Sequence, residues 1–380
     1  MKIAVFSDAF FPLIDGVTVS IGKNMRILSE NNEIFFFIPS GSTDLKLKNS
    51  KQIELKSFPI KSYKEYKLRI PSFFKAYTEL KKINPDIIHV HTIFGIGWEG
   101  IVSAKLLKIP IVATSHTVFP EVTTELDLLG LEKTERFKRI AWRYMISFLR
   151  RCNAVIAPSE AMKKDLISHG LKIPIYPISN GIKTESYSYV KRKEKDPIFL
   201  SMGRLVESKQ VNITLKAFSI FKKKGMKGIL WLAGKGVEEK SLKEYVKKEN
   251  LNEYVKFLGF VEYEKTPKIY QEADIFVTSS KTETEGMSTI EAMSTGLPVI
   301  GVKERATPYL VGKDAGFIAP IGNSKKIAEY MERLAKNYKL RIKLGKNASL
   351  KTKRYEIKST NKKIYEAYKK IISDFKKRKN

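Results

Sequence analysis

The stretch IFVTSSKTETEGMSTIEAMSTGLPVI, residues 275–300, places a strand, a loop, a helix and a second strand in immediate succession. The runs IFVT (275–278) and LPVI (297–300) are apolar on both faces, as strands of a parallel sheet covered by helices should be. Between them, Gly296 follows MSTIEAMST at the position that commonly comes after the last turn of a helix. The pattern predicts a βαβ unit.

The same alternation of short apolar runs and amphipathic segments extends over almost the whole chain. Further strands are predicted at IAVF (3–6), EIFFFI (33–38), DIIHV (86–90), IVAT (111–114), AVIA (154–157), IFLSM (198–202), ILWLA (229–233) and VKFL (255–258). This series is too long for one sheet, and the polar stretch KTESYSYVKRKEKD (183–196) interrupts it as a linker would. We therefore expect two Rossmann-like doubly wound α/β domains, residues 1–185 and 186–360, that face each other across a cleft. A C-terminal helix, residues 361–380, is expected to pack back toward the first domain.

The composition is that of a globular protein. Hydrophobic residues make up 43% and charged residues 29% of the 380 residues, unlike a disordered chain. Cys152 is the only cysteine, which excludes an internal disulfide and a cysteine-cluster metal site and agrees with a reducing compartment. The N-terminal MKIAVFSDAFF has the pattern of a first strand rather than a signal peptide, and no apolar run is long enough to predict a membrane span. We expect a cytoplasmic protein.

The chain is strongly basic, since Lys+Arg 70 against Asp+Glu 40 gives a formal net charge of +30. Such a charge favours anionic partners, namely nucleic acid, phosphorylated substrates or an anionic membrane surface. Solvated lysine spread over every surface explains the same count equally well. Charge alone therefore does not select a partner.

Carboxylates surround the predicted start of the helix at Gly286. Ligands of open parallel sheets bind at the carboxyl ends of the strands, where Glu283, Glu285 and Glu291 follow the strand 275–278. Gly286 allows close approach to the backbone, and acceptors for hydroxyl groups beside amide donors for phosphate suit a nucleotide sugar. One structural alternative is a capping box, Ser288-x-x-Glu291. The other is a solvated loop that carries Glu283 and Glu285.

Two cations follow another predicted strand. IFLSM runs into GRLVESK, which places Arg204 and Lys209 just past the carboxyl end of the strand. An arginine forks onto phosphate oxygens and a lysine acts as a point charge, so the pair suits a diphosphate, with ordinary surface positions as the alternative. Gly234-x-Gly236, after ILWLA, lacks the third glycine of a dinucleotide fingerprint and predicts only a tight turn.

The first domain offers a glycine and three histidines. Gly16, in DGV between the first strand and its helix, would allow the helix N-terminus to approach a ligand. His116 follows the strand IVAT, whereas His89 and His91 lie together at the end of DIIHV. Three imidazoles could ligate zinc, but no carboxylate or cysteine completes an obvious set. We therefore favour His116 as a functional residue, and the alternative is a satisfied buried histidine.

Together these motifs resemble those of the retaining glycosyltransferases of family four, and the resemblance covers nearly the whole chain. Its most specific motif is a Glu-x7-Glu pair, Glu283 to Glu291 within ETEGMSTIEAMSTGLPVI. Similar segments are GRLVESK, DGV, ATSHT, NGI (180–182) and FLGFV (257–261). ETEGMSTIEAM, PDIIHVHT and the TSHT region look most like the diacylglycerol glycosyltransferases and the phosphatidylinositol mannosyltransferases.

The resemblance implies the two-domain GT-B fold and a binding site for the nucleotide of a donor sugar. Arg204 and Lys209 would hold the donor diphosphate, and Gly16 would line the phosphate side from the opposite domain. Glu291 would bind the ribose hydroxyls. The backbone near Val261 would contact the base.

The resemblance also implies a site for the transferred sugar. Glu283 and the amides of Gly286, Met287 and Ser288 would hold that sugar, and His116 would contact it from the opposite domain near the reacting carbon. The implied catalytic residues are His116, Arg204, Lys209 and Glu283.

We expect no metal and no cofactor, and a UDP- or GDP-sugar as donor. Many sugar transferases bind a divalent ion through Asp-x-Asp, which this sequence does not contain, so fixed cations and helix amides would stabilise the leaving diphosphate. The family retains the anomeric configuration. No carboxylate is assigned as a covalent nucleophile, and same-face departure, with the leaving phosphate assisting the incoming hydroxyl, is compatible with these residues.

Three segments depart from the family pattern. Lys183 stands where the family often has an acid after NGI, and KERATPYLV lacks the usual paired glycines. HTVFPEV differs from the tyrosine-rich version that is common in members with lipid acceptors. These differences concern the choice of donor and acceptor rather than the core assignment.

Two stretches of the first domain interleave basic and aromatic residues in what we predict to be helices. They are LEKTERFKRIAWRYMISFLRRCNA (131–154) and KSYKEYKLRIPSFFKAYTELKK (61–82). Basic residues near an anionic bilayer contribute about 1 kcal/mol each, and aromatic residues can enter the interface. Ordinary core-facing helices with a solvated back are the alternative. With the resemblance, we expect a peripheral protein on the cytoplasmic face of the membrane that transfers a hexose to a lipid such as diacylglycerol.

Other functions remain open at this point. A family-four transferase with a soluble sugar, sugar-phosphate or polysaccharide acceptor is the main alternative. A sugar-nucleotide epimerase of the same fold would turn over without any acceptor. No nucleic-acid partner is expected, because the sequence shows no recognition-helix or RNA-binding motif.

Overall fold

The computed structural model describes residues 1–13, 15–60, 63–69, 72–118 and 134–378, and it divides into two units. Unit 1 comprises Met1–Gly181 and Ile357–Asn380, and unit 2 comprises Ile182–Glu356. The chain therefore leaves unit 1 at Gly181 and returns to it for its last helix, α14 (Ile357–Lys377).

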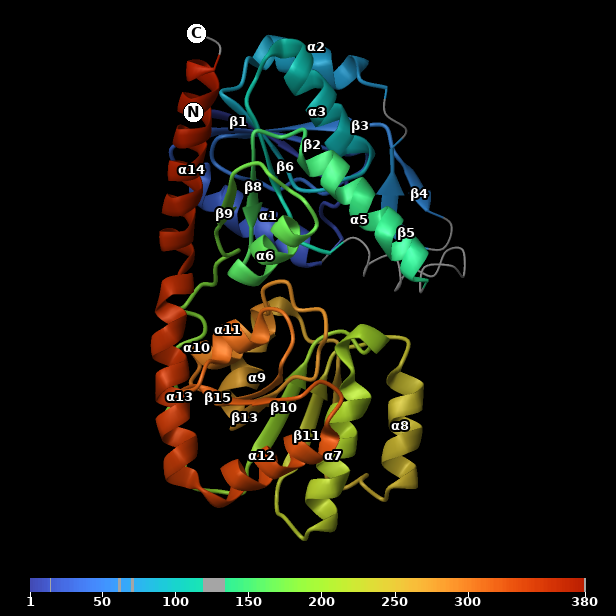
Figure 1. The fold of residues 1–380 in the computed structure, drawn as a ribbon, viewed down its shortest axis with the longest axis vertical. Coiled ribbons are helices and arrows are strands. Elements are labelled where there is room, and N and C mark those ends of the chain that lie inside the picture. The colour runs from blue at the N-terminus through green and yellow to red at the C-terminus, as the bar shows by residue number, and fades with distance from the viewer. Residues whose placement is uncertain (14, 61–62, 70–71, 119–133, 379–380) are drawn as a thin grey trace. The chain divides into compact units, whose positions relative to one another are not determined.

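The described part of unit 1 contains a seven-stranded sheet with the order β3-β2-β1-β6-β7-β8-β9 (Figure 1). All neighbouring strands in it are parallel. The strands are β1 (Lys2–Phe6), β2 (Glu33–Pro39), β3 (Ser50–Leu55), β6 (Ile87–Val90), β7 (Ile111–Thr114), β8 (Ala154–Ala157) and β9 (Ile175–Pro177). The strand order runs from β1 to β2 and β3 on one side and from β6 to β9 on the other, so the topological switch point lies between β1 and β6. Ligands of such sheets bind at the carboxyl ends of the strands at this point.

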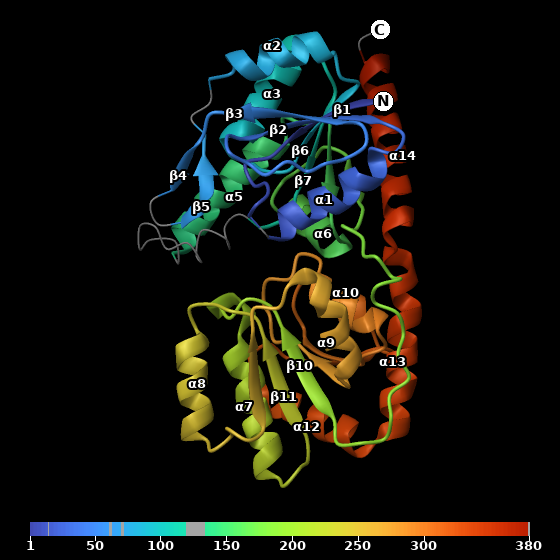
Figure 2. The ribbon, with the colours of Figure 1, turned by 180° about the vertical axis from the view of Figure 1, so that it is seen from behind.

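Helices cover both faces of this sheet because its strands are apolar on both faces. Ala4 and Phe6 of β1 pack into a cluster with α2 (Phe74–Ile83), α3 (Gly95–Leu107), α5 (Glu135–Leu149) and α6 (Glu160–Ser168). Ile3 and Val5 of the same strand pack on the other face with α1 (Gly16–Leu28) and α14, which lie side by side (Figure 2).

One stretch of unit 1 differs from its sequence prediction. Residues 61–82 are predicted as one basic helix, but their first part forms the strand β5 (Tyr63–Leu68), antiparallel to β4 (Phe58–Ile60), and α2 begins only at Phe74. Pairing with β4 gives the aromatic-rich segment a partner for its backbone that helical periodicity does not reveal. Residues 61–62 and 70–71 lie outside the described part of the chain.

Unit 2 contains a second parallel sheet, with the order β12-β11-β10-β13-β14-β15 in the described residues. The strands are β10 (Ile198–Met202), β11 (Ile229–Ala233), β12 (Val255–Gly259), β13 (Ile275–Val277), β14 (Val299–Val302) and β15 (Gly316–Ala319). One face packs against α7 (Val211–Lys223), α8 (Glu239–Lys248) and α12 (Ser324–Lys336), and the other packs against α9 (Thr266–Glu272), α10 (Met287–Ser294) and α11 (Thr307–Val311). With α13 (Tyr338–Thr352), these elements complete a Rossmann-like domain. The prediction of two such domains is confirmed.

The stretch 183–196, predicted as a linker, is anchored in unit 2. Tyr187 is fully buried, and the buried Arg192 donates hydrogen bonds to the carbonyls of Ala273 (3.1 Å) and Tyr270 (3.0 Å). The polar composition of this stretch does not predict its burial. Arg192 is buried because its guanidinium bonds backbone carbonyls that lie far away in the sequence.

Candidate functional site

The candidate donor residues of unit 2 follow strands that meet at one edge of the sheet. Arg204 and Lys209 follow β10, and Glu283 follows β13, its hydrogen-bonded neighbour. β10 is also the strand from which the order runs outward in both directions, to β11 and β12 on one side and β13 to β15 on the other. These residues therefore lie at the topological switch point, where open α/β sheets bind their ligands.

The segment after β10 is fixed by the loop after β11. Gly203 donates a backbone hydrogen bond to Ala233 (2.9 Å), and Leu205 donates one to Lys235 (2.9 Å). A Cβ on Gly234 would come within 1.9 Å of the Gly203 oxygen, and one on Gly236 within 2.1 Å of the Leu205 oxygen. Gly234-x-Gly236 is thus a tight turn whose glycines allow the two loops to touch.

The side chains of Lys209 and Glu283 form an ion pair, with Nζ 2.7 Å from Oε1. Both line a small pocket together with Arg204, which is exposed, and Ser280. Burial raises the pKa of Glu283, but the Lys209 ammonium, a hydrogen bond from Ser280 and the Arg204 charge together bring that pKa below its usual value. Glu283 therefore stays ionised between two cations.

The two halves of this pocket are tied together by hydrogen bonds. Ser279 donates to the carbonyl of Gln210 (2.5 Å), and its hydroxyl also contacts Thr214 Oγ1 (2.8 Å) on α7. The amide of Lys281 donates to the carbonyl of Ser208 (3.1 Å) in the short 3-10 helix Glu207–Lys209. The loop that carries Glu283 is therefore held against the loop that carries Lys209.

Helix α10 begins shortly after Glu283 in the sequence and has no side-chain cap. Its N-cap residue, Gly286, has φ 81 and ψ 51 and receives no side-chain hydrogen bond, whereas α1, α6 and α12 are capped by Asp15, Ser159 and Asn323. The first amides of the helix, at Met287 and the partly buried residue after it, Ser288, thus remain available to an anion in the part of the chain that the structure describes.

The two structural alternatives for the acids near this helix are not what the structure shows. The capping box Ser288-x-x-Glu291 does not form, because Gly286 rather than Ser288 is the N-cap residue. Glu291 is buried and accepts a hydrogen bond from the Tyr270 hydroxyl (3.1 Å). Glu285 is also buried rather than solvated.

Val261 lies in a third loop at the same edge of the unit 2 sheet. It is half-buried and follows β12 and the exposed Phe260, just before α9 begins at Thr266. The candidate contacts that unit 2 offers to diphosphate, sugar, ribose and base therefore lie on α10 and in the loops that follow β10, β12 and β13.

In unit 1, Gly16 is the first residue of α1, as predicted. The Asp15 side chain accepts from the Thr18 amide (2.8 Å), and the Thr18 hydroxyl accepts from the Asp15 amide (3.0 Å), which forms a capping box. Gly16 itself is exposed, and among the described residues a Cβ there would meet nothing within 4 Å. The space at Gly16 is therefore open.

The three histidines form a buried polar layer at the ends of β6 and β7. His116 Nε2 lies 2.8 Å from His91 Nδ1, and His116 also bonds Asn180. His89 instead contacts Tyr368 of α14 (2.5 Å) and Thr114 (2.6 Å). Desolvation lowers the pKa of His116 to about 4 and that of His89 to about 3, so both are neutral at pH 7.

The structure does not support a zinc site at these histidines. In the described residues, no three His, Cys, Asp or Glu side chains are arranged so that they could hold a metal ion. His116 is only 8% exposed, so its burial also agrees with the alternative of a structural histidine.

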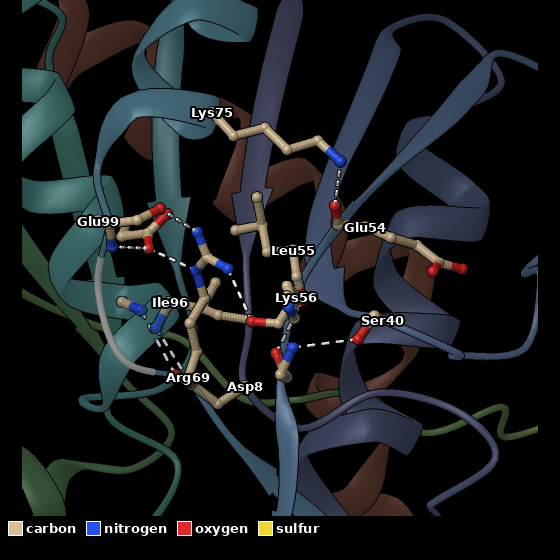
Figure 3. A network of polar contacts seen from close by, with 12 residues as sticks. Asp8, Ser40, Glu54, Leu55, Lys56, Arg69, Lys75, Ile96 and Glu99 are labelled. Carbon is tan, nitrogen blue, oxygen red and sulfur yellow. Dashed lines mark hydrogen bonds and ion pairs between the residues drawn. The ribbon is translucent and has the colours of Figure 1, made fainter.

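A second polar network, which the sequence did not reveal, orders the same edge of unit 1 (Figure 3). Asp8, after β1, accepts from the Thr92 hydroxyl (2.6 Å) and from the Ile96 amide (2.9 Å) at the start of α3. The Arg69 guanidinium pairs with the fully buried Glu99 and donates to the Lys56 carbonyl (2.7 Å). The N-terminus of α3 is thus occupied by the chain's own carboxylate, in contrast to that of α10.

The basic stretches of unit 1 expose part of their charge. On α5, the exposed residues include Arg136, Arg139, Ile140 and Arg143, whereas Met145 and Phe148 face the core. Phe74, at the start of α2, is 77% exposed. Residues 119–133 lie outside the described part of the chain, which includes the first residues of the predicted helix 131–154. Among the described helices, none combines the length and the apolar composition needed to cross a membrane.

Comparison with known proteins identifies the family. Residues 14–186 match Glycosyltransferase Family 4, and residues 183–351 match Glycosyl transferases group 1. The alpha-monoglucosyldiacylglycerol synthase of Acholeplasma laidlawii is 26% identical over 376 residues, which cover 93% of this chain and 93% of the relative. The enzyme of that name from Streptococcus pneumoniae is 27% identical over 326 residues, which cover 82% of this chain and 72% of the relative.

A solved structure shares the fold. Anabaena Alr3699/HepE, crystallised in complex with UDP and glucose, has a TM-score of 0.74 at 18% identity, with 97% of this chain and 100% of that chain covered. The chain belongs to the family-four glycosyltransferases and has the GT-B class of fold. It is therefore an enzyme that transfers a sugar.

Proposed function

We propose that this protein is a retaining, metal-independent glycosyltransferase that moves a hexose from a UDP- or GDP-sugar to a hydroxyl group of a membrane lipid such as diacylglycerol. The donor half of the proposal is carried by one observation. Arg204, Lys209 and Glu283 line one pocket in unit 2, and Glu283 comes shortly before the uncapped start of α10 in the sequence. The Anabaena protein of similar fold was crystallised with UDP and glucose, which agrees with a nucleotide-sugar donor.

The leaving diphosphate needs compensation for the charge that builds on its oxygens. Arg204 and Lys209 supply two positive charges, and the amides at the start of α10 supply the positive end of a helix dipole. Lys209 is already held by Glu283, so it is oriented before the donor arrives. Groups that are fixed in advance require little reorganisation when the bond breaks.

Glu283 would bind hydroxyl groups of the transferred sugar rather than attack its reacting carbon. Its carboxylate is ionised and bonded to Lys209, and a carboxylate has acceptor positions for several donors. We propose that the incoming hydroxyl attacks from the face that the diphosphate leaves, and that a phosphate oxygen takes its proton. This step retains the anomeric configuration without a covalent enzyme intermediate. His116 and Gly16 of unit 1 are proposed to complete the site.

A lipid acceptor is supported by the two similar synthases, whose names identify monoglucosyldiacylglycerol as their product. The exposed arginines of α5 suit an anionic surface, and we propose that the protein acts as a peripheral protein on the cytoplasmic face of the membrane. A soluble acceptor is the second candidate, because HTVFPEV departs from the pattern of lipid-acceptor members.

A donor and acceptor screen tests the proposal. Thermal shifts with UDP-, GDP- and ADP-sugars identify the nucleotide, and labelled donor is then offered diacylglycerol in mixed micelles, soluble sugars and sugar phosphates. We expect a lipid product with the donor's anomeric configuration by NMR, and a rate that survives EDTA. A product only with soluble acceptors contradicts the lipid assignment, an inverted product contradicts retention, and loss of activity in EDTA contradicts metal independence.

A further inference from the structure

Tyr270 contacts one of the proposed donor-binding carboxylates. It is fully buried on α9, and its hydroxyl donates a hydrogen bond to Glu291 Oε2 over 3.1 Å. Glu291, on α10, is itself buried. The two residues come from different helices on the same face of the unit 2 sheet, so their contact is a product of tertiary packing.

The tyrosine is held on several sides. Its ring packs edge-on against Tyr187, with centroids 5.9 Å apart, and lies tilted against Phe276 of β13, with centroids 6.1 Å apart. Its carbonyl accepts a hydrogen bond from Arg192 (3.0 Å). A side chain packed in this way loses little further freedom when it fixes a neighbour, which is the requirement for a group that orients another.

In this contact the Tyr270 hydroxyl is the donor and the Glu291 carboxylate is the acceptor. Burial raises the pKa of the Tyr270 hydroxyl well above 10.0, and the nearby Glu291 charge raises it further, so the hydroxyl keeps its proton near neutral pH and donates a hydrogen bond to the carboxylate. A carboxylate offers about four acceptor positions, so the Tyr270 hydroxyl restrains the orientation of Glu291 while occupying one of them.

We propose that Tyr270 is a positioning residue that orients the Glu291 carboxylate toward the ribose hydroxyls of the donor nucleotide. The inference rests on the proposed function, which assigns Glu291 to the ribose. Tyr270 acts through Glu291 and does not touch the donor. Because α9 follows the loop of Val261, Tyr270 also connects the carboxylate to the segment that would contact the base.

The chain provides a matched control in Tyr187. It is equally buried and packs against Tyr270, but its hydroxyl bonds Thr266 Oγ1 (2.8 Å) rather than Glu291. Tyr270→Phe and Tyr187→Phe each remove one buried hydroxyl and keep the ring. Only the first removes a bond to the carboxylate, so a difference between them reports on Glu291 and not on the loss of packing.

Calorimetric dissociation constants for UDP and GDP, and for their 2′,3′-dideoxy analogues, test the inference. We expect the wild type to prefer the nucleotide with ribose hydroxyls. Tyr270→Phe should weaken binding of that nucleotide about tenfold, the order expected for a hydrogen bond to a charged group, and leave the dideoxy analogue within about twofold. Glu291→Gln should show the same selective loss, whereas Tyr187→Phe should match the wild type.

The outcomes separate this inference from the proposed function. If Tyr270→Phe keeps the wild-type preference while Glu291→Gln loses it, the positioning role is wrong and the donor site stands. If both phenylalanine variants weaken both ligands alike, Tyr270 is only a packing residue, and the inference is also wrong. If the wild type binds neither nucleotide, or binds ribose and dideoxy forms equally, the proposed ribose contact fails and the inference fails with it.

Discussion

At the scale of single residues, the Lys209–Glu283 pair determines how the donor site is charged before substrate binds. The ammonium and the carboxylate are 2.7 Å apart, and their side chains are 22% and 13% exposed. Removing either partner of such a pair leaves the other partly desolvated without compensation, which costs more than the pair itself contributes. The Lys209 ammonium therefore helps to keep Glu283 in the ionised form that the proposed chemistry requires.

We predict that Arg204→Ala and Lys209→Ala each lower kcat/KM about a hundredfold or more, the typical cost of removing one group that stabilises a developing oxyanion. Initial rates with the donor found in the screen measure the effect, and circular dichroism checks the fold. Lys216→Ala, at an exposed position on α7 in the same unit, should retain the wild-type rate. Rates near wild type for both Arg204→Ala and Lys209→Ala would show that these cations do not bind the leaving group.

Individual residues also show where sequence reasoning reaches its limit. Arg204, Lys209 and Glu283 are expected at one sheet edge because each follows a strand, and the structure gathers them around one pocket. The contact of Tyr270 with Glu291 is not foreseeable, since no spacing rule links a residue on α9 to one on α10. The same holds for Asp8, whose partners Thr92 and Ile96 belong to another βα unit.

At the scale of secondary-structure elements, the start of α10 depends on a glycine in a left-handed conformation. Gly286 has φ 81, and a Cβ there would lie 2.9 Å from Leu310 Cδ1. The left-handed conformation costs an L-residue about 1–2 kcal/mol of folding free energy, and the close contact with Leu310 adds to this cost. The first amides of α10, which we propose to hold the donor, would shift as the helix start relaxes.

We therefore predict that Gly286→Ala lowers the free energy of unfolding by about 2 kcal/mol and reduces donor turnover. Urea denaturation measures the first effect and initial rates the second. Gly16→Ala is the stability control, because Gly16 also begins a helix but has no atom within 4 Å of an added Cβ. Equal stabilities for the two variants would contradict the structural reason given for Gly286.

The histidine layer between β6 and β7 links pH to stability. His89 and His116 have folded pKa values of about 3 and 4, and desolvation also lowers that of His91. The unfolded chain takes up these protons near pH ~6.5, whereas the folded chain does not until the pH is much lower. The contribution of each histidine is thus present above pH ~6.5 and is lost as the pH falls toward the folded value.

For His89 this linkage is worth about 2 kcal/mol between pH 7 and pH 5. We predict that the loss of unfolding free energy over that interval is smaller by this amount in His89→Gln than in the wild type, as measured in urea at both pH values. An unchanged pH dependence in His89→Gln would mean that His89 is not buried in the neutral form.

Among the elements, the central parallel strands are predictable from the sequence, whereas the edge strands β3, β9 and β15 are not. Apolar runs such as IFVT and IFLSM identify buried strands because both of their faces must be covered. The pattern of residues 61–82 predicts a helix where β5 pairs with β4, since two short strands that pair with each other carry no such signal. The capping box considered at Ser288 does not form, because the N-cap residue of α10 is Gly286, two residues earlier.

At the scale of the whole molecule, the net charge of +30 becomes informative only where it gathers on a surface. Each basic residue near an anionic bilayer contributes about 1 kcal/mol, so three exposed arginines on α5 account for about a hundredfold in affinity. If membrane affinity came from lysine spread over the whole surface, it would not depend on the arginines of one helix. Substitution of matched sets of residues therefore distinguishes a membrane-directed surface from general basic composition.

We predict that the protein floats with vesicles of anionic phospholipid and not with neutral phosphatidylcholine. Replacing Arg136, Arg139 and Arg143 with serine should weaken that binding about a hundredfold. The control replaces Lys240, Lys247 and Lys248, which are exposed on α8 of unit 2, and should bind like the wild type. Equal losses for the two sets would assign the binding to overall charge, and no preference for anionic vesicles would remove the membrane proposal.

The return of the chain to unit 1 at Ile357 has a consequence for biosynthesis. Ile364, Tyr368 and Ile371 of α14 complete the cluster that buries Ile3 and Val5. While the ribosome is still translating, unit 2 is continuous and is able to fold as soon as it emerges, but the N-terminal sheet must wait with one apolar face partly bare. The domain that is made first is therefore finished last, and a chain truncated before Ile357 would present that face to chaperones or to other nascent chains.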